Sequence, residues 1–354
     1  MRTPLFIIRY IKYEYWPWWL FYLPIVPYWL YFSVKNKSLT YLFAANPAIP
    51  TGGFVGESKS DILKLIDSKY LPNSMDVEAC DLKSILDQMK ARGIIFPVIA
   101  KPDVGERGFG VSKINNEIEL EIYNSTATSK YIIQEFVDYE IELGILYSRL
   151  PNSLHGEISS VTRKVFLSVE GDGSSTINEL MQRSTRARFQ IKRIGAIIGE
   201  DMEIVLAKGQ SRLLEPIGNH CRGTRFIDNN FLINKQLVDV FNEISLDIKG
   251  FYFGRFDLKV KSIEDLYQGK NIKIMELNGA SSEPGHIYDS SNSVFKAYRD
   301  MYRHWRRLEE VSRINIQNGH RPESIGSVIK ELFNQNKNHK RIKPEKESPT
   351  FIAG

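Results

Sequence analysis

Cysteine is scarce in this sequence of 354 residues, which contains two, Cys80 and Cys221. They lie far apart and outside any CxxC spacing, so the sequence predicts neither a disulfide framework nor a zinc site. A reducing, cytoplasmic setting is therefore the expectation. The sequence also lacks the small-residue cleavage site that follows the apolar part of a signal peptide.

An excess of charge of one sign is also missing. Lys and Arg number 47 and Asp and Glu number 42, which gives a formal net charge of +5. This modest positive charge suits small anionic substrates or an acidic membrane surface, and it does not indicate a nucleic-acid partner. With 42% hydrophobic residues, the chain has the composition of a globular protein and the length for two or three domains.

Aromatic residues are concentrated near the N-terminus, in the segment Trp16–Phe32. Pro17, Pro24 and Pro27 interrupt it and would leave backbone groups unpaired in hydrocarbon, so the segment is predicted to lie at an interface and not to span a bilayer. Basic residues on both sides favour peripheral membrane contact, because Trp and Tyr also gather at membrane surfaces. The alternative is an arm packed on its own protein or used for self-association, and the sequence leaves both open.

Turn residues and apolar periodicity divide the rest of the chain into strands and helices. Strands are predicted over 38–45, 94–100 and 131–137, and helices near 58–66, over 82–91, after Ser175 or Thr176, and over 298–307. The last helix places apolar residues on one stripe and arginines elsewhere, which is typical of a helix docked on a core. The lysine-rich end from Asn334 is predicted to be a flexible tail.

Two runs near the C-terminal end, Phe253–Val260 and Ile272–Asn278, alternate apolar and polar residues and are predicted to form an antiparallel strand pair. The pair would bring Asp257 beside Glu276 and Asn278, and such oxygen ligands suit Mg²⁺. The alternation places Ile274 on the face of Glu276 and turns Met275 towards the core. The alternative is that these carboxylates are simply solvated strand residues.

A buried strand delivers Lys101 directly before a loop that contains Gly105, Gly108 and Gly110. Glycines allow backbone N–H groups to approach phosphate oxygens, and a nearby lysine adds a point charge. The spacing is neither a Walker loop nor GxGxxG, so a plain hairpin is the alternative.

Two further polar loops are candidates for binding substrate carboxylates. The first contains Arg222 and Arg225, whose guanidinium groups suit anions. The second is glycine-rich and contains Ser281 and Ser282. We therefore expect these four residues to lie at the substrate site.

Taken in order, the lysine, the glycine-rich loop, a strand with spaced glutamates, and the Asp and Glu-x-Asn strands resemble the ATP-grasp superfamily. Within it, the chain is similar to carboxylate–amine ligases such as D-alanine–D-alanine ligase, and Val169–Ile177 is similar to a segment of cyanophycin synthetase. The resemblance covers about residues 56–300. It implies an α/β (α+β) fold in which two lobes with antiparallel sheets clasp ATP.

The resemblance also divides the chain and assigns its residues. The implied parts are an atypical aromatic segment over 1–55, a small lobe over 56–137, a large lobe over 138–310 and a basic tail over 311–354. The implied ATP-binding residues are Lys59, Lys101, Gly105, Gly108 and Gly110 at the phosphates, Glu135, Phe136 and Val137 at the adenine, and Glu142 at the ribose. The implied ligands of two Mg²⁺ ions, which Mn²⁺ could replace, are Asp257, Glu276 and Asn278. Arg255 is the implied catalytic residue at the acyl-phosphate, with Lys101 as the second.

The activity implied is ATP-dependent joining of a carboxylate to an amine through an acyl-phosphate, with release of ADP and phosphate. A kinase or phosphotransferase would use the same nucleotide site and stop at phosphoryl transfer, and a non-catalytic ATP-binding protein is the third possibility. The run Asn278–Gly285 departs from the Asn-Thr-Ser-Pro-Gly run of D-alanine–D-alanine ligases. The identity of the two substrates therefore stays open.

Overall fold

The computed structural model describes residues 3–78, 80–105 and 109–330. Its strands are β1 (Ser74–Val77), β2 (Val98–Pro102), β3 (Ser112–Ile114), β4 (Tyr131–Glu135), β5 (Ile141–Arg149), β6 (Gly156–Val165), β7 (Leu167–Glu170), β8 (Ser211–Glu215), β9 (Arg225–Asp228), β10 (Phe253–Val260) and β11 (Ile272–Asn278). Its α-helices are α1 (Leu5–Ile11), α2 (Trp18–Tyr22), α3 (Val26–Lys35), α4 (Lys59–Leu63), α5 (Leu82–Ala91), α6 (Glu117–Thr126), α7 (Ile177–Arg183), α8 (Thr185–Arg188), α9 (Ile191–Ile198), α10 (Lys235–Leu246), α11 (Ile263–Tyr267) and α12 (Val294–Gln317).

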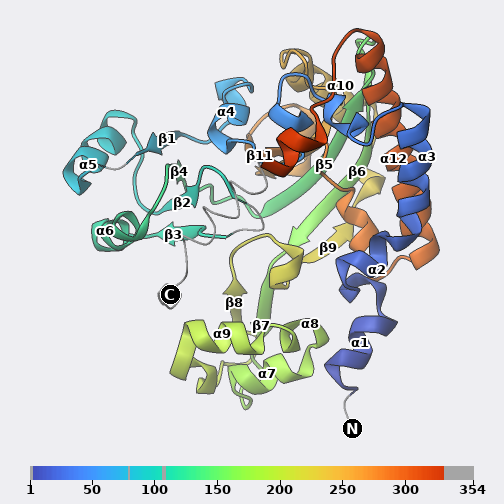
Figure 1. Ribbon diagram of the computed structural model, residues 1–354. Coiled ribbons are helices and arrows are strands. Elements are labelled where there is room, and N and C mark those ends of the chain that lie inside the picture. Colours follow the sequence, from blue (N-terminus) through green and yellow to red (C-terminus); the bar gives the residue numbers. More distant parts are fainter. Residues whose placement is uncertain (1–2, 79, 106–108, 331–354) are drawn as a thin grey trace.

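The smaller main sheet contains four antiparallel strands in the order β1-β4-β2-β3. Helices α5 and α6 lie beside it, at the left of Figure 1. Ile85 and Met89 of α5 and Leu120 of α6 share a buried cluster with Val98 and Ile133 of the sheet. One face of this sheet therefore forms a hydrophobic core with α5 and α6. The opposite face is not covered by these two helices.

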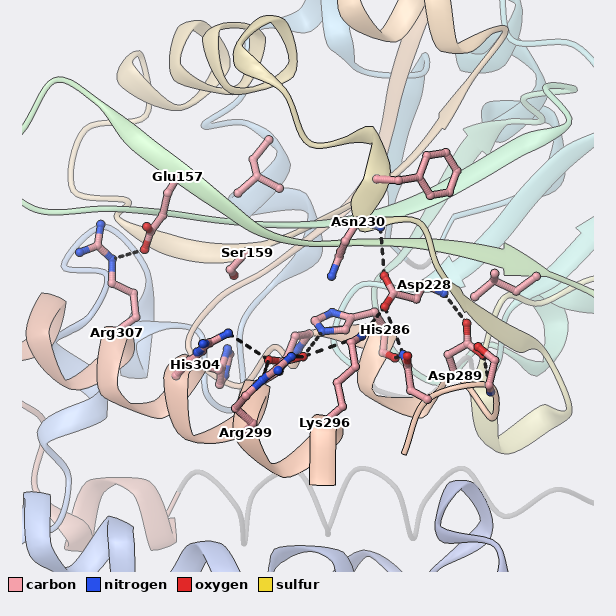
Figure 2. Close-up of a pocket in the computed structure, with 18 of the residues that line it drawn as sticks. Glu157, Ser159, Asp228, Asn230, His286, Asp289, Lys296, Arg299, His304 and Arg307 are labelled. Carbon is pink, nitrogen blue, oxygen red and sulfur yellow. Dashed lines mark hydrogen bonds and ion pairs between the residues drawn. The ribbon is translucent and has the colours of Figure 1, made fainter. Parts of the chain in front are cut away.

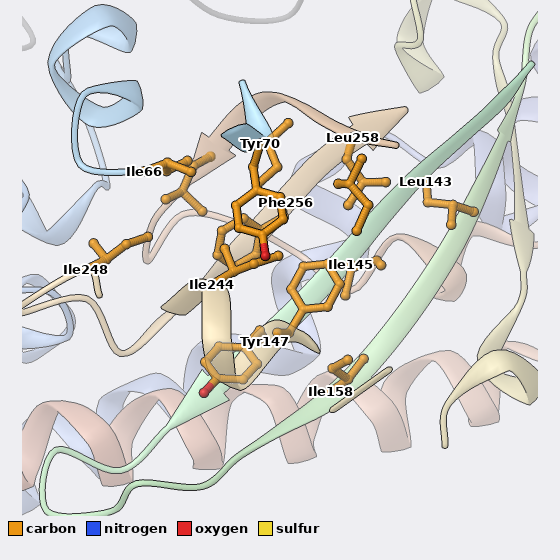
Figure 3. Packing of buried hydrophobic residues seen from close by; sticks show 14 of the residues in the cluster. Ile66, Tyr70, Leu143, Ile145, Tyr147, Ile158, Ile244, Ile248, Phe256 and Leu258 are labelled. Atoms are coloured by element: carbon orange, nitrogen blue, oxygen red, sulfur yellow. The ribbon is translucent and has the colours of Figure 1, made fainter. Parts of the chain in front are cut away.

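The larger sheet contains five antiparallel strands in the order β11-β10-β5-β6-β9. Its apolar face packs against α4, α10 and α11 in one buried cluster. Figure 3 shows part of this cluster, with Phe256 and Leu258 of β10 near Leu143 and Ile145 of β5. The strand alternation sends the polar side chains of the same strands to the opposite face.

A third unit consists of the two-stranded sheet β7-β8 and the helices α7, α8 and α9. Helix α7 begins at Thr176, whose hydroxyl accepts a hydrogen bond from the backbone of Glu179, while the Glu179 side chain accepts one from the Thr176 backbone. This capping box satisfies two N–H groups that the helix itself cannot pair. It confirms the helix predicted after Ser175 or Thr176.

The aromatic N-terminal segment folds into α1, α2 and α3, which run along the side of the molecule where α12 lies (Figure 1). Its inner side chains are buried against α12 and the neighbouring loop: Phe21 stacks on Tyr298 with ring centres 5.3 Å apart, and Phe32 joins a cluster with Leu308. The alternative of an arm packed on its own protein is thus confirmed for this inner face. None of the described helices combines the length and apolar character needed to cross a bilayer.

The predicted α/β class with antiparallel sheets is confirmed, as are several elements. Helix α5 spans Leu82–Ala91 as predicted. Helix α4 begins at Lys59, directly after its N-cap Ser58, whose hydroxyl accepts from the Asp61 backbone N–H, and it ends at Leu63 and not at 66. Strand β2 begins at Val98 and not at 94, because Pro97 has no N–H to donate to a neighbouring strand. Helix α12 extends beyond the predicted 298–307 in both directions. The tail predicted from Asn334 lies outside the described residues.

The strand predicted over 38–45 is wrong. Residues Tyr41–Ala44 form a 3₁₀ helix, and Tyr41, Leu42 and Ala44 are all buried. A strand would turn successive side chains to opposite faces, whereas a helical turn presents several of them to α12. Asn315 of α12 donates hydrogen bonds to the carbonyls of Ala44 and Ala45, which fixes the end of this turn.

The strand pair predicted from β10 and β11 is confirmed, but the face predicted for Ile274 is wrong. Asp257 pairs with Glu276 while the next residue, Leu258, pairs with Ile274, so the register shifts by one residue at Met275. Such a bulge exchanges the two faces of the strand beyond it. Ile274 therefore lies in the core with Leu277, and Glu276 keeps its place beside Asp257.

We expect Phe256→Ala to lower the free energy of unfolding by about 3–5 kcal/mol, because this fully buried ring packs against Phe241 and Phe251 and its loss leaves a cavity. Phe231→Ala is the matched control: the Phe231 side chain is exposed, so the change should be within about 0.5 kcal/mol. Urea unfolding of both variants checks this. Equal effects would contradict the described core.

Candidate nucleotide and metal site

The polar face of the larger sheet carries a compact group of charged residues. The pairing of β10 with β11 sets Asp257 opposite Glu276 and Arg255 opposite Asn278. Asp257 is only 5% exposed. Asp257 is therefore not a solvated strand carboxylate, whereas Glu276 and Asn278 are partly exposed.

Two cations fix the Asp257 carboxylate. Arg255 donates to it from Nε at 2.7 Å and from a terminal nitrogen at 3.1 Å, and Lys164 Nζ lies 3.3 Å away. Burial alone would raise the pKa of the Asp257 carboxyl, but the charges of Arg255 and Lys164 hold that pKa below its ordinary value. Lys164 also pairs with Glu142 at 3.1 Å, so a chain of alternating charges runs across β10, β5 and β6.

Two glycines make room for this charged chain. A Cβ atom at Gly144 would lie 3.1 Å from the Asp257 carboxylate, and one at Gly218 would lie 2.5 Å from the Glu142 carboxylate. Gly218 belongs to the loop that precedes Arg222, so this loop lies directly against Glu142. A larger residue at Gly218 would displace the carboxylate or the loop.

Lys101 connects the two main sheets. It leaves β2 of the smaller sheet, and its Nζ donates to Gln134 Oε1 at 3.2 Å and to the carbonyl of Met275, on β11 of the larger sheet, at 3.1 Å. Burial lowers the pKa of the Lys101 ammonium to about 8, although the nearby Glu276 charge acts in the opposite direction. A buried ammonium thus lies beside the carboxylate pair of β10 and β11.

The other residues predicted at the phosphates gather near Lys101. Lys59 Nζ donates to the carbonyl of Gly105, and the Lys59 backbone N–H donates to the Asp103 carbonyl. Gly110 has a φ of +67°, and a Cβ there would lie 2.8 Å from a Pro102 ring carbon, so the loop requires glycine at this position. Gly108 lies outside the described residues.

The segment Glu135–Val137 connects the smaller sheet to the larger one. β4 ends at Glu135, and the carbonyl of Val137 accepts a hydrogen bond from Lys259 of β10 at 3.0 Å. Lys113 and Lys259 lie over the Phe136 ring, at 4.1 and 5.5 Å from its centre. This segment, which is predicted at the adenine, therefore contacts both sheets.

The four residues predicted at the substrate carboxylates have separate surroundings. Arg222 lies 3.8 Å from the buried Glu215 carboxylate, and Arg225 is exposed at the start of β9. Ser281 is exposed, whereas Ser282 is buried and donates to the carbonyl of its own loop residue Gly279 at 2.6 Å. Among the described contacts, none joins the arginine pair to the serine pair.

Sequence analysis missed four residues of this neighbourhood: Lys164, His220, Glu283 and Tyr288. Arg255 donates to the Glu283 carbonyl at 3.2 Å, and Tyr288 donates to the Glu283 carboxylate at 2.7 Å. Burial raises the pKa of the Glu283 carboxyl to about 7, although the Tyr288 hydroxyl acts in the opposite direction. The alternation along β6 could have indicated Lys164, but no local pattern distinguishes Glu283 from an ordinary loop acid.

His220 completes this group. Its ring centre lies 5.1 Å from that of Tyr288, and its buried Nε2 has no hydrogen-bond partner among the described residues. Burial lowers the pKa of the His220 imidazole to about 3, with a further contribution from Arg186. The result is a neutral imidazole with an unused nitrogen, and its ring lies beside Tyr288, which itself contacts Glu283.

A cavity of about 890 Å³ lies between β6, β9 and α12 (Figure 2). None of the residues predicted at the nucleotide or the metals lines it. His286 is held in the wall of this cavity: its Nδ1 lies 2.7 Å from the Ser160 hydroxyl and its Nε2 lies 3.3 Å from the Asp300 carboxylate. The loop after Asn278 therefore contributes to both regions, because Pro284 and His286 line the cavity and the Glu283 carbonyl accepts from Arg255.

The oxygen atoms of Asp257, Glu276 and Asn278 fit the chemistry of Mg²⁺, which uses one or two carboxylates together with substrate phosphates. Within the described ranges, no group of three His, Cys, Asp or Glu side chains is arranged to hold a metal ion. Asp257, Glu276 and Asn278 therefore fit Mg²⁺ only if a phosphate supplies further oxygen ligands. The Lys101 ammonium lies close enough to Glu276 to offset the negative charge of such a phosphate.

We expect Asp257→Asn to destabilise the protein by about 3–5 kcal/mol at neutral pH, because it removes the buried counter-charge of the partly buried Arg255 and Lys164. The folded pKa of Asp257 lies below 3.8, so its contribution is complete above that pH and is lost as the pH falls below the folded value. Chemical denaturation of the wild type and the variant across this range should show the difference shrinking in acid. Exposed Asp239→Asn is the control, and a difference independent of pH would contradict the charge network.

No protein-family model and no curated protein matches the sequence. Among solved structures, the chain is similar to the D-alanine–D-alanine ligase of Bacillus anthracis, with 14% identity and a TM-score of 0.42 over 74% of this chain and 69% of that chain. It is similar to the VanG D-Ala:D-Ser ligase of Enterococcus faecalis, with 13% identity and a TM-score of 0.39 over 71% and 61%. It is also similar to a bifunctional glutathione synthetase from Pasteurella multocida, with 15% identity and a TM-score of 0.37 over 68% of this chain and 36% of that enzyme.

Proposed function

We propose that this protein is an ATP-dependent ligase of the ATP-grasp type that joins a carboxylate to an amine. The observation that carries the proposal is the position of Lys101, which leaves one antiparallel sheet and contacts β11 of the other beside Glu276. A buried cation and a carboxylate pair between two sheets can neutralise a polyphosphate from both sides. The order of the motifs along the chain supports the same assignment.

The nucleotide would lie between the two sheets. The phosphates would contact Lys59, Lys101 and the loop from Gly105 to Gly110, of which Gly108 is part. The adenine would contact the connecting segment Glu135–Val137, and Glu142 would accept hydrogen bonds from the ribose hydroxyls. Lys164 holds the Glu142 carboxylate in a fixed position, which reduces the cost of ordering it on binding.

Asp257, Glu276 and Asn278 would hold two Mg²⁺ ions, or Mn²⁺ in their place, and the bound metal would neutralise charge on the phosphate oxygens. Arg255 and Lys164 keep the Asp257 carboxylate ionised and oriented. Such pre-organised side chains contribute to catalysis because they do not have to reorient during the reaction.

The reaction would begin with attack of a substrate carboxylate oxygen on the γ-phosphorus of ATP. The new O–P bond forms as the bond to the bridging oxygen breaks, and ADP leaves with the electron pair. The amine nitrogen then attacks the acyl carbon, and phosphate leaves as the amide forms. Arg255 would stabilise the oxyanion of the tetrahedral intermediate.

The attacking amine must lose a proton, and Glu283 would accept it. Its carboxylate lies in the loop whose carbonyl binds Arg255, and its pKa of about 7 is suited to a general base near neutral pH. The substrate carboxylates would be bound by the four residues that the sequence predicts there: Arg222, Arg225, Ser281 and Ser282.

Screening amino acids and small peptides for ATP-dependent phosphate release tests the proposed function. Glu276→Gln should abolish turnover in Mg²⁺ and keep the fold, because Glu276 faces the site and not the core. Exposed Glu264→Gln is the matched control and should keep full activity. A carboxylate substrate labelled with heavy oxygen should pass one label to the released phosphate.

Each other product pattern excludes this mechanism. AMP and pyrophosphate would indicate adenylation, and a phosphorylated product without an amide would indicate a kinase or phosphotransferase. Binding of ATP without turnover of any kind would indicate a non-catalytic ATP-binding protein.

Glu283→Gln should lower the rate of amide formation about 10²–10⁴-fold, because the attacking amine loses its proton acceptor. Trapping with hydroxylamine should show that acyl-phosphate still forms. In the wild type, the rate should rise with pH through about 7 as Glu283 ionises. Tyr288→Phe removes a hydrogen bond that stabilises the carboxylate, so this rise should move to higher pH.

An acyl-phosphate that no longer forms in Glu283→Gln would assign the residue to the first step instead. An unchanged pH profile in Tyr288→Phe would show that Glu283 is not the group that titrates.

A further inference from the structure

The outward side of the N-terminal helices is apolar, although a surface helix usually exposes polar residues. Phe6, Trp18 and Val34 are 69%, 71% and 79% exposed. We call the whole set the N-terminal apolar face. Its members, all large and exposed, are Phe6, Tyr10, Ile11, Trp18, Trp19, Leu23, Val26, Leu30, Tyr31, Val34 and Leu39.

This face is separate from the side of the helices that belongs to the core. In α3, Val26, Leu30 and Val34 are spaced four residues apart and form one exposed stripe, whereas Phe32 is buried against α12. Helix α3 therefore has two apolar sides, and packing within the chain accounts for only one of them. An exposed apolar area on this scale marks an interaction surface.

Charges around this face have one sign. The described residues from 3 to 40 contain one acid, Glu14, and it is buried and paired with Arg186. Three exposed cations flank the apolar residues, Arg9, Lys12 and Lys37, and a fourth, Lys35, is paired with Glu309 at 3.2 Å. The potential over the face is thus positive, and an anionic partner would be favoured.

Two partners could cover this apolar face, a second copy of the chain or an anionic bilayer. The charges around the face favour one of them. A second copy of the chain would set the same cations opposite one another across a twofold axis, at a cost in repulsion. An anionic bilayer would neutralise them and accept the aromatic side chains at the level of its headgroups. The helices are too short and too often interrupted, by Pro17, Pro24 and Pro27, to enter further.

We propose that the N-terminal apolar face docks the protein on an anionic membrane surface, with α1, α2 and α3 lying in the plane of the interface. In Figure 1 these helices lie on the side of the molecule away from the four-stranded sheet, with α12 behind α3. Docking through this side leaves the region between the two main sheets in contact with water. The proposal does not depend on the reaction proposed above.

Co-sedimentation of the full-length protein with vesicles tests this docking. The protein should bind vesicles that contain phosphatidylserine, and binding to vesicles of phosphatidylcholine alone should be at least tenfold weaker. The variant R9Q/K12Q/K37Q should bind the anionic vesicles about a hundredfold more weakly. The control K83Q/K90Q/K192Q removes three exposed charges elsewhere and should bind as the wild type does.

The apolar contribution is tested with W18S/V34S, which should also lose binding at least tenfold. The control I118S/L154S changes two similarly exposed apolar residues on other elements and should have no effect. Circular dichroism confirms that each variant is folded. Concentration-dependent dimers that W18S/V34S abolishes, without vesicle binding, would overturn the proposal in favour of a second copy, and vesicle binding unchanged in both N-terminal variants would overturn it outright.

Discussion

The salt bridges of Asp257 with Arg255 and Lys164 are the interaction on which the rest of the site depends. They join three neighbouring strands of the larger sheet, because Lys164 also holds Glu142. Charges this deeply buried are tolerated only when they are paired, so the sheet cannot lose one without exposing the others to an unfavourable environment. The same pairing holds Arg255 towards Glu283 and so orders the loop after β11.

Lys101 extends this network to the second sheet. Its ammonium contacts the backbone of β11 while its own strand belongs to the smaller sheet, so this lysine joins the two sheets by a polar contact. The Lys101 ammonium also donates a hydrogen bond to the side chain of Gln134 on β4.

Helix α12 has the corresponding role on the other side of the molecule. Its 24 residues bury Met301 and Leu308 against the aromatic N-terminal helices, and its Asn315 fixes the turn at Ala44 and Ala45. The N-terminal segment is thereby held as part of the body. Helix α12 covers only the inner side of the N-terminal helices. The N-terminal apolar face on their outer side is therefore left exposed.

The sequence by itself determined many of the local elements and the pairing of β10 with β11, since alternation fixes which strand residues share a face and caps fix where α4, α5 and α7 begin. Pairing of Asp257 with Glu276 followed from that alternation. The bulge at Met275, the helical turn at Tyr41 and the contact of Lys101 with β11 were decided by tertiary packing. Glu283, Tyr288 and His220 also come together only in the folded chain, because burial and neighbouring charge set their chemistry and neither is encoded in a local pattern.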